Sequence, residues 1–194
     1  MSMINPDKFN YKYKPSSPDR SLLISTGVPP KTADKALEIY KRDSPPALPS
    51  FEGKDIMFLH GDTGSGKTVT SAMLILDFIF NKKVKADKIK FTTVSDLLFE
   101  FKANYSDPHS MSERELFREY SMAKLMVLDD LGTQKITDWN LEIIQMIIYH
   151  RYESYRPTIV TSNYDLSTLT EVMQNERITS RLNDSVTISL LNTK

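Results

Sequence analysis

The octapeptide GDTGSGKT, residues 61–68, decides the fold of this chain. It satisfies the pattern G-x-x-x-x-G-K-[ST]. A short apolar run, DIMFLH (55–60), precedes it, and a segment of helical length begins at Lys67. Glycines in such a loop let successive backbone N–H groups face one phosphate, and the following helix adds its positive N-terminus. The bland alternative is a Gly-rich turn that only joins a strand to a helix. Because strand, loop and helix stand in register, the stretch predicts a nucleotide-binding loop.

The loop supplies the predicted phosphate site. Its members are Gly61, Asp62, Thr63, Gly64, Ser65, Gly66, Lys67 and Thr68. The Lys67 ammonium is expected to neutralise the β and γ oxygens, and the Thr68 hydroxyl to take a position on a magnesium ion. The predicted cofactors are therefore ATP and Mg²⁺.

The second half of such a site is an apolar strand that ends in a carboxylate, and LMVLDDLG (125–132) supplies one. Asp129 is expected to hold the magnesium through water, and Asp130 to orient or deprotonate the attacking water. The alternative is a solvated turn, since Asp-Asp pairs are common in turns. The phosphate loop upstream favours the functional interpretation.

Two further elements follow. PTIVTSN (157–163) reads as a strand ending in Asn163, a neutral amide that could bond the γ-phosphate or the lytic water, although Asn after a strand is usually a turn residue. In NERITSRLND (175–184), Arg177 and Arg181 are four residues apart and share one helical face. Such a face suits an anion, or an ordinary salt bridge to a nearby carboxylate.

The apolar pattern predicts an α/β domain with a largely parallel sheet covered on both faces. Strands are expected at 55–60, 88–94, 124–130, 157–163 and 185–191, separated by helices, one of them opened by a capping box at Ser112 and Glu115. We expect the compact domain to occupy residues 51–194. Residues 1–50, with five prolines between 29 and 49 and one short helix near 32–42, are expected to be an extension and linker.

Composition narrows the class of protein. The 25 basic residues balance 25 acidic ones, so no global basic field indicates nucleic acid, and any such contact must be local. The absence of cysteine excludes disulfides and thiolate metal sites. No apolar run approaches a membrane span and the N-terminus has no signal-peptide pattern, so a cytoplasmic protein without membrane contact is expected.

GDTGSGKT, LMVLDDLG, PTIVTSN and ERITSRL, in this order, resemble the AAA+ ATPases. More narrowly, they resemble the DnaC/DnaI-type replicative helicase loaders and their relatives, the IstB-type transposition ATPases. The Asp-Asp pair, the stretch RYESYRPTIVTSNYDLSTL and the GVPPK segment ahead of the domain are similar to that group. The resemblance covers about residues 25 to 190.

The resemblance implies a P-loop NTPase sheet of strand order 5-1-4-3-2. It implies Lys67 and Thr68 as Walker A residues, Asp129 and Asp130 as Walker B residues, and Asn163 as sensor 1. It also implies an arginine finger that completes the ATP site of a neighbouring subunit. Position favours Arg181 for that role, and the choice between Arg181 and Arg177 stays open. The chain stops soon after the last strand, so the helical lid of a typical AAA+ protein is expected to be absent and turnover to be slow.

In that group, the segment between the second strand and Walker B touches single-stranded DNA. Phe101, Lys102 and Tyr105 are the candidate contacts here. Leu97, Leu98 and Phe101 equally fit the core stripe of a helix, so both interpretations stand at this point.

The leading hypothesis is an ATP-dependent loader that forms a homo-oligomer with ATP on single-stranded DNA and delivers or opens a ring-shaped, DnaB-like replicative helicase. KFNYKYKP (8–15), where aromatics alternate with lysines, is the candidate partner segment. The alternative is an IstB-like ATPase that recruits a transposase to DNA. A P-loop kinase for a small molecule is a third class, but no substrate pocket or covering lid is indicated.

Overall fold

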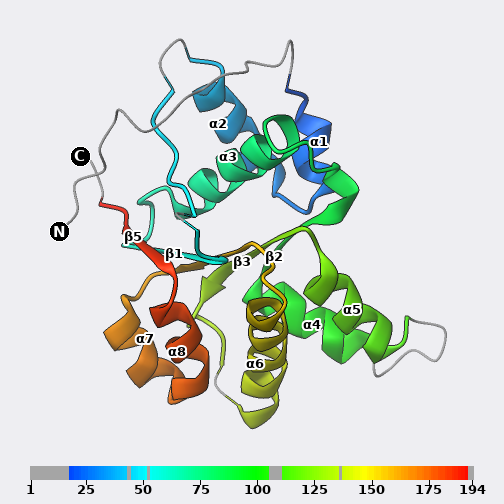
Figure 1. Ribbon diagram of the computed structural model, residues 1–194, viewed down its shortest axis with the longest axis vertical. Helices are drawn as coiled ribbons and strands as arrows, with labels where there is room; N and C mark the ends of the chain where they lie inside the picture. Colours follow the sequence, from blue (N-terminus) through cyan, green and yellow to red (C-terminus); the bar gives the residue numbers. More distant parts are fainter. Residues whose placement is uncertain (1–17, 43–44, 52, 105–110, 136, 192–194) are drawn as a thin grey trace.

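The computed structural model describes residues 18–42, 45–51, 53–104, 111–135 and 137–191 (Figure 1). Its centre is a five-stranded sheet in which every neighbouring pair is parallel, in the order β2-β3-β4-β1-β5. The strands are β1 (Ile56–His60), β2 (Ile89–Thr93), β3 (Leu125–Leu131), β4 (Thr158–Ser162) and β5 (Val186–Ser189). This confirms the order 5-1-4-3-2 and the predicted strands, whose ends differ by at most two residues.

One face of the sheet is covered by α1 (Arg20–Ser25), α2 (Pro30–Tyr40) and α3 (Lys67–Phe80), which Figure 1 shows above the strands. Ala33, Ala36, Leu37 and Tyr40 recur at helical spacing and are buried on α2. They share one core with Leu23 of α1 and with most of the apolar residues of α3. The packed body of the chain therefore extends ahead of Phe51, where the compact domain was expected to begin.

Further helices of the described ranges cover the other face, and Figure 1 shows them below the strands. They are α4 (Val94–Asn104), α5 (Glu113–Met122), α6 (Asp138–Glu153), α7 (Leu166–Met173) and α8 (Glu176–Asn183); a short 3₁₀ turn, η2 (Ala86–Lys88), precedes β2. Ser112 and Glu115 form the predicted capping box at the start of α5. None of the helices in the described ranges is both long and apolar enough to cross a bilayer.

A fully buried cation joins three elements of this second face. The Arg151 guanidinium on α6 donates to the carbonyl oxygens of Tyr120, Ser121 and Ala123 at the end of α5, at 2.9, 3.2 and 3.0 Å. It also donates to Pro157 O at 2.6 Å and to the Thr158 hydroxyl at 2.8 Å, at the start of β4. Burial lowers the pKa of Arg151 to about 9, so the group still carries its charge at neutral pH. Carbonyl dipoles, including those at a helix C-terminus, thus replace a carboxylate as its partner.

Candidate nucleotide site

The phosphate loop lies between β1 and α3, at the carboxyl end of the sheet. Gly61 has φ +148°, and a Cβ there would lie 2.1 Å from the backbone oxygen of Leu190. The loop cannot move away from this contact freely, because Leu190 N donates to His60 O at 2.7 Å. Gly66, at φ +93°, is the left-handed residue from which α3 begins. Glycine at both positions is therefore a geometric requirement of the loop.

Lys67 reaches back from the first turn of α3 into the loop. Its ammonium donates to Gly61 O at 2.7 Å, to Asp62 O at 3.0 Å and to the Asn163 side-chain oxygen at 2.9 Å. Only 5% of Lys67 is exposed. Desolvation lowers the pKa of Lys67, against the opposing pull of the carboxylates of Asp130, Asp129 and Asp62. The predicted Walker A lysine and the predicted sensor asparagine are thus already in contact.

Thr68 and Asp129 form the second pair of the site. The Thr68 hydroxyl donates to Asp129 Oδ2 at 3.0 Å. Asp129 is 3% exposed, and burial raises the pKa of its carboxyl group although the Thr161 hydrogen bond acts in the opposite direction. A hydroxyl beside a carboxylate is a pair of hard oxygen ligands suited to Mg²⁺. No group of three or more His, Cys, Asp or Glu side chains gathers as a metal site in the described ranges, so these two residues would hold Mg²⁺ together with phosphate oxygens and water.

Thr161 organises both acidic residues, a role that the sequence analysis missed. Its hydroxyl donates to Asp129 Oδ1 at 2.6 Å and accepts the Asp130 backbone N–H at 2.9 Å. The pairing of β3 with β4 shifts register between Leu128 and Leu131, and Asp130 there has φ +62°. This bulge separates the two carboxylates, so that Asp129 faces Thr68 while Asp130 lines the cavity of the phosphate loop.

That cavity has a volume of about 260 Å³. It is lined by Lys35, Thr63, Gly64, Gly66, Lys67, Thr68, Val69, Asp130 and Asn163. The structure therefore brings together most of the predicted residues of the phosphate site with Asp130 and Asn163. The Ser65 hydroxyl of the same loop is buried and has no hydrogen-bond partner among the described residues, which leaves one donor for an incoming group. Lys35 was missed, because the sequence places it in the expected linker.

The two arginines of α8 do not line this cavity. The Arg181 guanidinium lies 5.3 Å from the centre of the Tyr149 ring and donates to Ser180 Oγ at 2.9 Å. Arg177 is exposed on the same helix, which Asn175 caps. Their predicted roles in a neighbouring subunit's site stay predictions.

The structure places the three candidate DNA-contact residues in different environments. Phe101 is 1% exposed and packs near Tyr120 in the core, so the expected nucleic-acid contact is wrong for this residue and the core-stripe alternative holds. Lys102 is exposed, with its ammonium 5.3 Å from the centre of the Trp139 ring. Tyr105 lies outside the described residues. The exposed aromatic of α4 is Phe99, at 72%.

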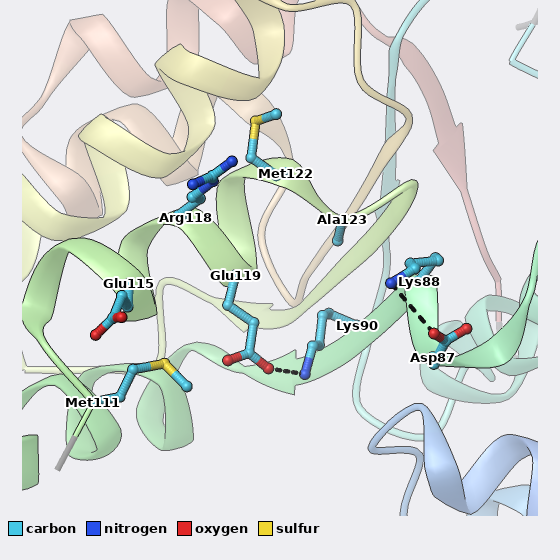
Figure 2. Close-up of a pocket in the computed structure, with 9 residues that line it drawn as sticks. All are labelled: Asp87, Lys88, Lys90, Met111, Glu115, Arg118, Glu119, Met122 and Ala123. Atoms are coloured by element: carbon cyan, nitrogen blue, oxygen red, sulfur yellow. Dashed lines mark hydrogen bonds and ion pairs between the residues drawn. The ribbon is translucent and has the colours of Figure 1, made fainter.

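A larger hollow of about 660 Å³ lies elsewhere, between η2, β2 and α5 (Figure 2). Its lysines are neutralised locally: Lys90 pairs with Glu119, and Lys88 pairs with Asp87 at 3.3 Å. No glycine is among the described residues that line it. The chemistry of the residues, rather than the size of the hollow, therefore selects the smaller cavity as the nucleotide site.

The family model of IstB-like ATP binding proteins matches residues 47–189, from just before β1 to the end of β5. The chain belongs to this family. The family is described as ATP-binding, and the smaller cavity, which the phosphate loop lines, is the candidate site for that nucleotide. The expected AAA+ resemblance is confirmed.

Among curated proteins, this IstB-like chain is similar to the replicative helicase loader DnaC of Escherichia coli strain K12. The two are 26% identical over 133 residues, which are 68% of this chain and 52% of DnaC. The chain thus spans about half the length of the curated relatives it matches.

Two solved structures share the fold. A DnaC helicase loader structure aligns over 93% of this chain and 94% of that chain, with a TM-score of 0.58 and 23% identity. The replication initiator DnaA bound to AMPPCP and single-stranded DNA aligns over 83% of this chain and 44% of that chain, with a TM-score of 0.61 and 16% identity. At these identities the likeness concerns the fold alone.

Proposed function

We propose that this protein is an ATP-dependent helicase loader of DNA replication. In this proposal, ATP-bound copies assemble on single-stranded DNA and deliver or open a ring-shaped, DnaB-like replicative helicase in the cytoplasm. The observation that carries the proposal is the similarity to the DnaC loader over 68% of this chain, a stretch that includes far more than the phosphate loop. The preassembled nucleotide site supports the ATP-dependent part.

Each residue of the ATP site has a distinct task in the proposal. Lys67 and the loop amides bind the phosphates, and Thr68 with Asp129 holds Mg²⁺, which would neutralise the charge that develops on the phosphates. Asp130, at the cavity surface, orients the attacking water or accepts its proton. Asn163, which lines the cavity and accepts a hydrogen bond from Lys67, acts on the γ-phosphate or the attacking water.

The proposal places hydrolysis at a site shared between subunits. Arg181 supports this placement in a specific way, because its guanidinium lies outside the cavity of its own chain and makes no ion pair with a described residue. A neighbouring subunit is then required to supply the cation that stabilises the transition state. Slow turnover in the isolated protein is the expected consequence.

The segment 8–15, KFNYKYKP, is the proposed helicase contact, and it lies outside the described residues. A pull-down with a DnaB-like helicase tests it by comparing the full chain with a variant that lacks residues 1–20. The loader proposal expects the full chain to retain the helicase. If the truncated chain retains as much helicase as the full chain, the helicase contact does not lie in segment 8–15, and the proposed ATP site is unaffected by that result.

The competing function is an IstB-like regulator of transposition, which the family match favours. The same ATP core would serve it, so the type of DNA distinguishes the two. Binding to single-stranded and duplex DNA of equal length should be compared across several salt concentrations with AMPPCP present, because phosphate contacts depend steeply on salt. Preference for the single strand supports the loader. Preference for duplex contradicts it and supports the regulator.

A further inference from the structure

We infer that Lys35 of α2 binds the phosphate chain of the nucleotide, so that α2 is a functional wall of the site. Lys35 and Lys67 are the two lysines among the residues that line the cavity. Lys67 belongs to the phosphate loop, whereas Lys35 comes from a helix that ends about twenty residues ahead of that loop. The inference rests on nucleotide binding at the loop and adds a residue to it.

Packing fixes α2 beside the loop. Its buried residues pack into the same core as α3, and the Tyr40 ring lies 6.5 Å from the Phe80 ring at the far end of α3. The turn before α2 is held on the sheet, because Phe91 N donates to Thr26 O at 2.7 Å. Gly27 lies so close to β2 that a Cβ at Gly27 would be 2.3 Å from the Phe91 backbone oxygen. Both ends of α2 are thus anchored, and the position of Lys35 follows from them.

The charge of Lys35 is available. The two carboxylates of α2 that could neutralise it are already engaged: Asp34 pairs with Arg20 at 2.7 Å, and Glu38 pairs with Arg42 at 3.3 Å. Within the described ranges, Lys35 itself makes no hydrogen bond or ion pair, and it is exposed toward the cavity. The four-carbon stem allows its ammonium to follow a ligand.

The cavity needs such a cation. All three N–H donors of Lys67 are directed at protein oxygens. Asp130 lines the cavity, and Asp129 lies next to it in hydrogen-bond contact with Thr68. A di- or triphosphate is polyanionic, so the acidic pair opposes its entry. An ammonium has donors and no acceptor, which suits phosphate oxygens rather than the base edge of a nucleotide. Lys35 therefore selects nucleoside di- and triphosphates by charge.

The test is calorimetric titration of the full chain with AMPPCP and Mg²⁺ at fixed ionic strength. Lys35→Gln keeps most of the length of the side chain and removes its charge, and Lys35→Arg restores the charge. Lys31→Gln is the matched control, since it removes an exposed lysine one turn earlier on α2 that does not line the cavity. We expect Lys35→Gln to weaken binding by about 3- to 10-fold, as for a partly exposed charged hydrogen bond. Lys35→Arg should recover most of the affinity, and Lys31→Gln should leave it unchanged.

The Lys67→Ala variant shows whether a negative result concerns Lys35 alone or the whole nucleotide site. If the wild type binds and Lys67→Ala does not, the phosphate loop is the site, and equal affinities of the wild type and Lys35→Gln then overturn the role of Lys35. An equal loss in Lys31→Gln and Lys35→Gln also overturns it, because a diffuse positive charge on α2 would explain both. If the wild type does not bind AMPPCP, the ATP site and the role of Lys35 are both wrong.

Discussion

The Lys67 ammonium donates a 2.9 Å hydrogen bond to the side-chain oxygen of Asn163, although 96 residues separate them. The sheet order explains the contact, because β4 lies next to β1 and its last residue, Ser162, pairs with His60 immediately before the phosphate loop. Two residues that the sequence predicts separately for phosphate chemistry are therefore held together in the fold itself. An incoming phosphate meets a lysine whose position is already set by the asparagine.

Asn163→Asp should abolish ATP binding, since a carboxylate at 2.9 Å would pair with Lys67 and repel the phosphates. Asn163→Ala should retain binding within a few-fold and lower the hydrolysis rate by about 10-fold or more, because the cavity loses the amide proposed to act on the γ-phosphate or the attacking water. Calorimetry with AMPPCP and a steady-state phosphate-release assay separate the two effects. Wild-type hydrolysis by Asn163→Ala would show that the amide has no part in the reaction.

Thr161→Val should disturb both acidic residues at once. The substitution keeps the shape of the side chain but leaves Asp129 without the 2.6 Å hydrogen bond and the Asp130 N–H without an acceptor. We expect a loss of about 1–3 kcal/mol in the free energy of unfolding and a fall in the rate of ATP hydrolysis. Thr161→Ser should restore both.

The distinguishing measurement for Thr161 is the Mg²⁺ concentration needed for half-maximal hydrolysis. A purely structural role would change stability and leave this concentration at the wild-type value. Because Thr161 acts through Asp129, we expect the Val variant to require more Mg²⁺ and the Ser variant to require the wild-type amount.

Arg181→Ala should lower hydrolysis by about 1,000-fold or more in the assembled protein while leaving AMPPCP affinity of the isolated chain unchanged. Mixing it with Lys67→Ala should restore part of the activity, because a Lys67→Ala subunit still offers Arg181 to a neighbour whose phosphate loop is intact. Arg177→Ala is the matched control on the same helix. Recovery with Arg177→Ala in place of Arg181→Ala would assign the finger to Arg177, and no recovery in either mixture would contradict a shared site.

Arg151→Met should lower the free energy of unfolding by about 3 kcal/mol or more, because the carbonyl groups of three residues at the end of α5 would lose the buried donor that they share. Arg156→Met is the control: Arg156 also donates to a carbonyl of α5, that of Met122, but this contact is exposed. Urea denaturation followed by circular dichroism measures both. Equal losses for the two variants would mean that burial of Arg151 adds nothing.

The parts of the site that have a local pattern could be predicted from the sequence. The phosphate loop, the strand that ends in two aspartates and the asparagine after β4 each have a local pattern, and a parallel sheet brings strand ends to one edge. The role of Thr161 could not be predicted, because it depends on the bulge that lets one hydroxyl bond both Asp129 and the Asp130 N–H. Such cross-strand geometry has no signature in a single segment.

The errors at the edges of the site have the same origin. The proline-rich composition of residues 29–49 suggested a linker, yet Ala33, Leu37 and Tyr40 complete a core with α3 and place Lys35 at the cavity. On α4, the sequence left open whether Phe101 contacts DNA or belongs to the core stripe. Packing against the sheet sets the rotation of that helix, which buries Phe101 and exposes Phe99.

In the proposed function the protein assembles only with both ATP and single-stranded DNA, and mass determination of the full chain in solution tests this dependence. The measurement compares the protein alone, with AMPPCP and Mg²⁺, and with AMPPCP, Mg²⁺ and a single-stranded oligonucleotide, with Lys67→Ala as the control that cannot respond to nucleotide. We expect a multimer only when nucleotide and DNA are both present, and none for Lys67→Ala. A wild-type mass that stays that of one chain in all three conditions would contradict it.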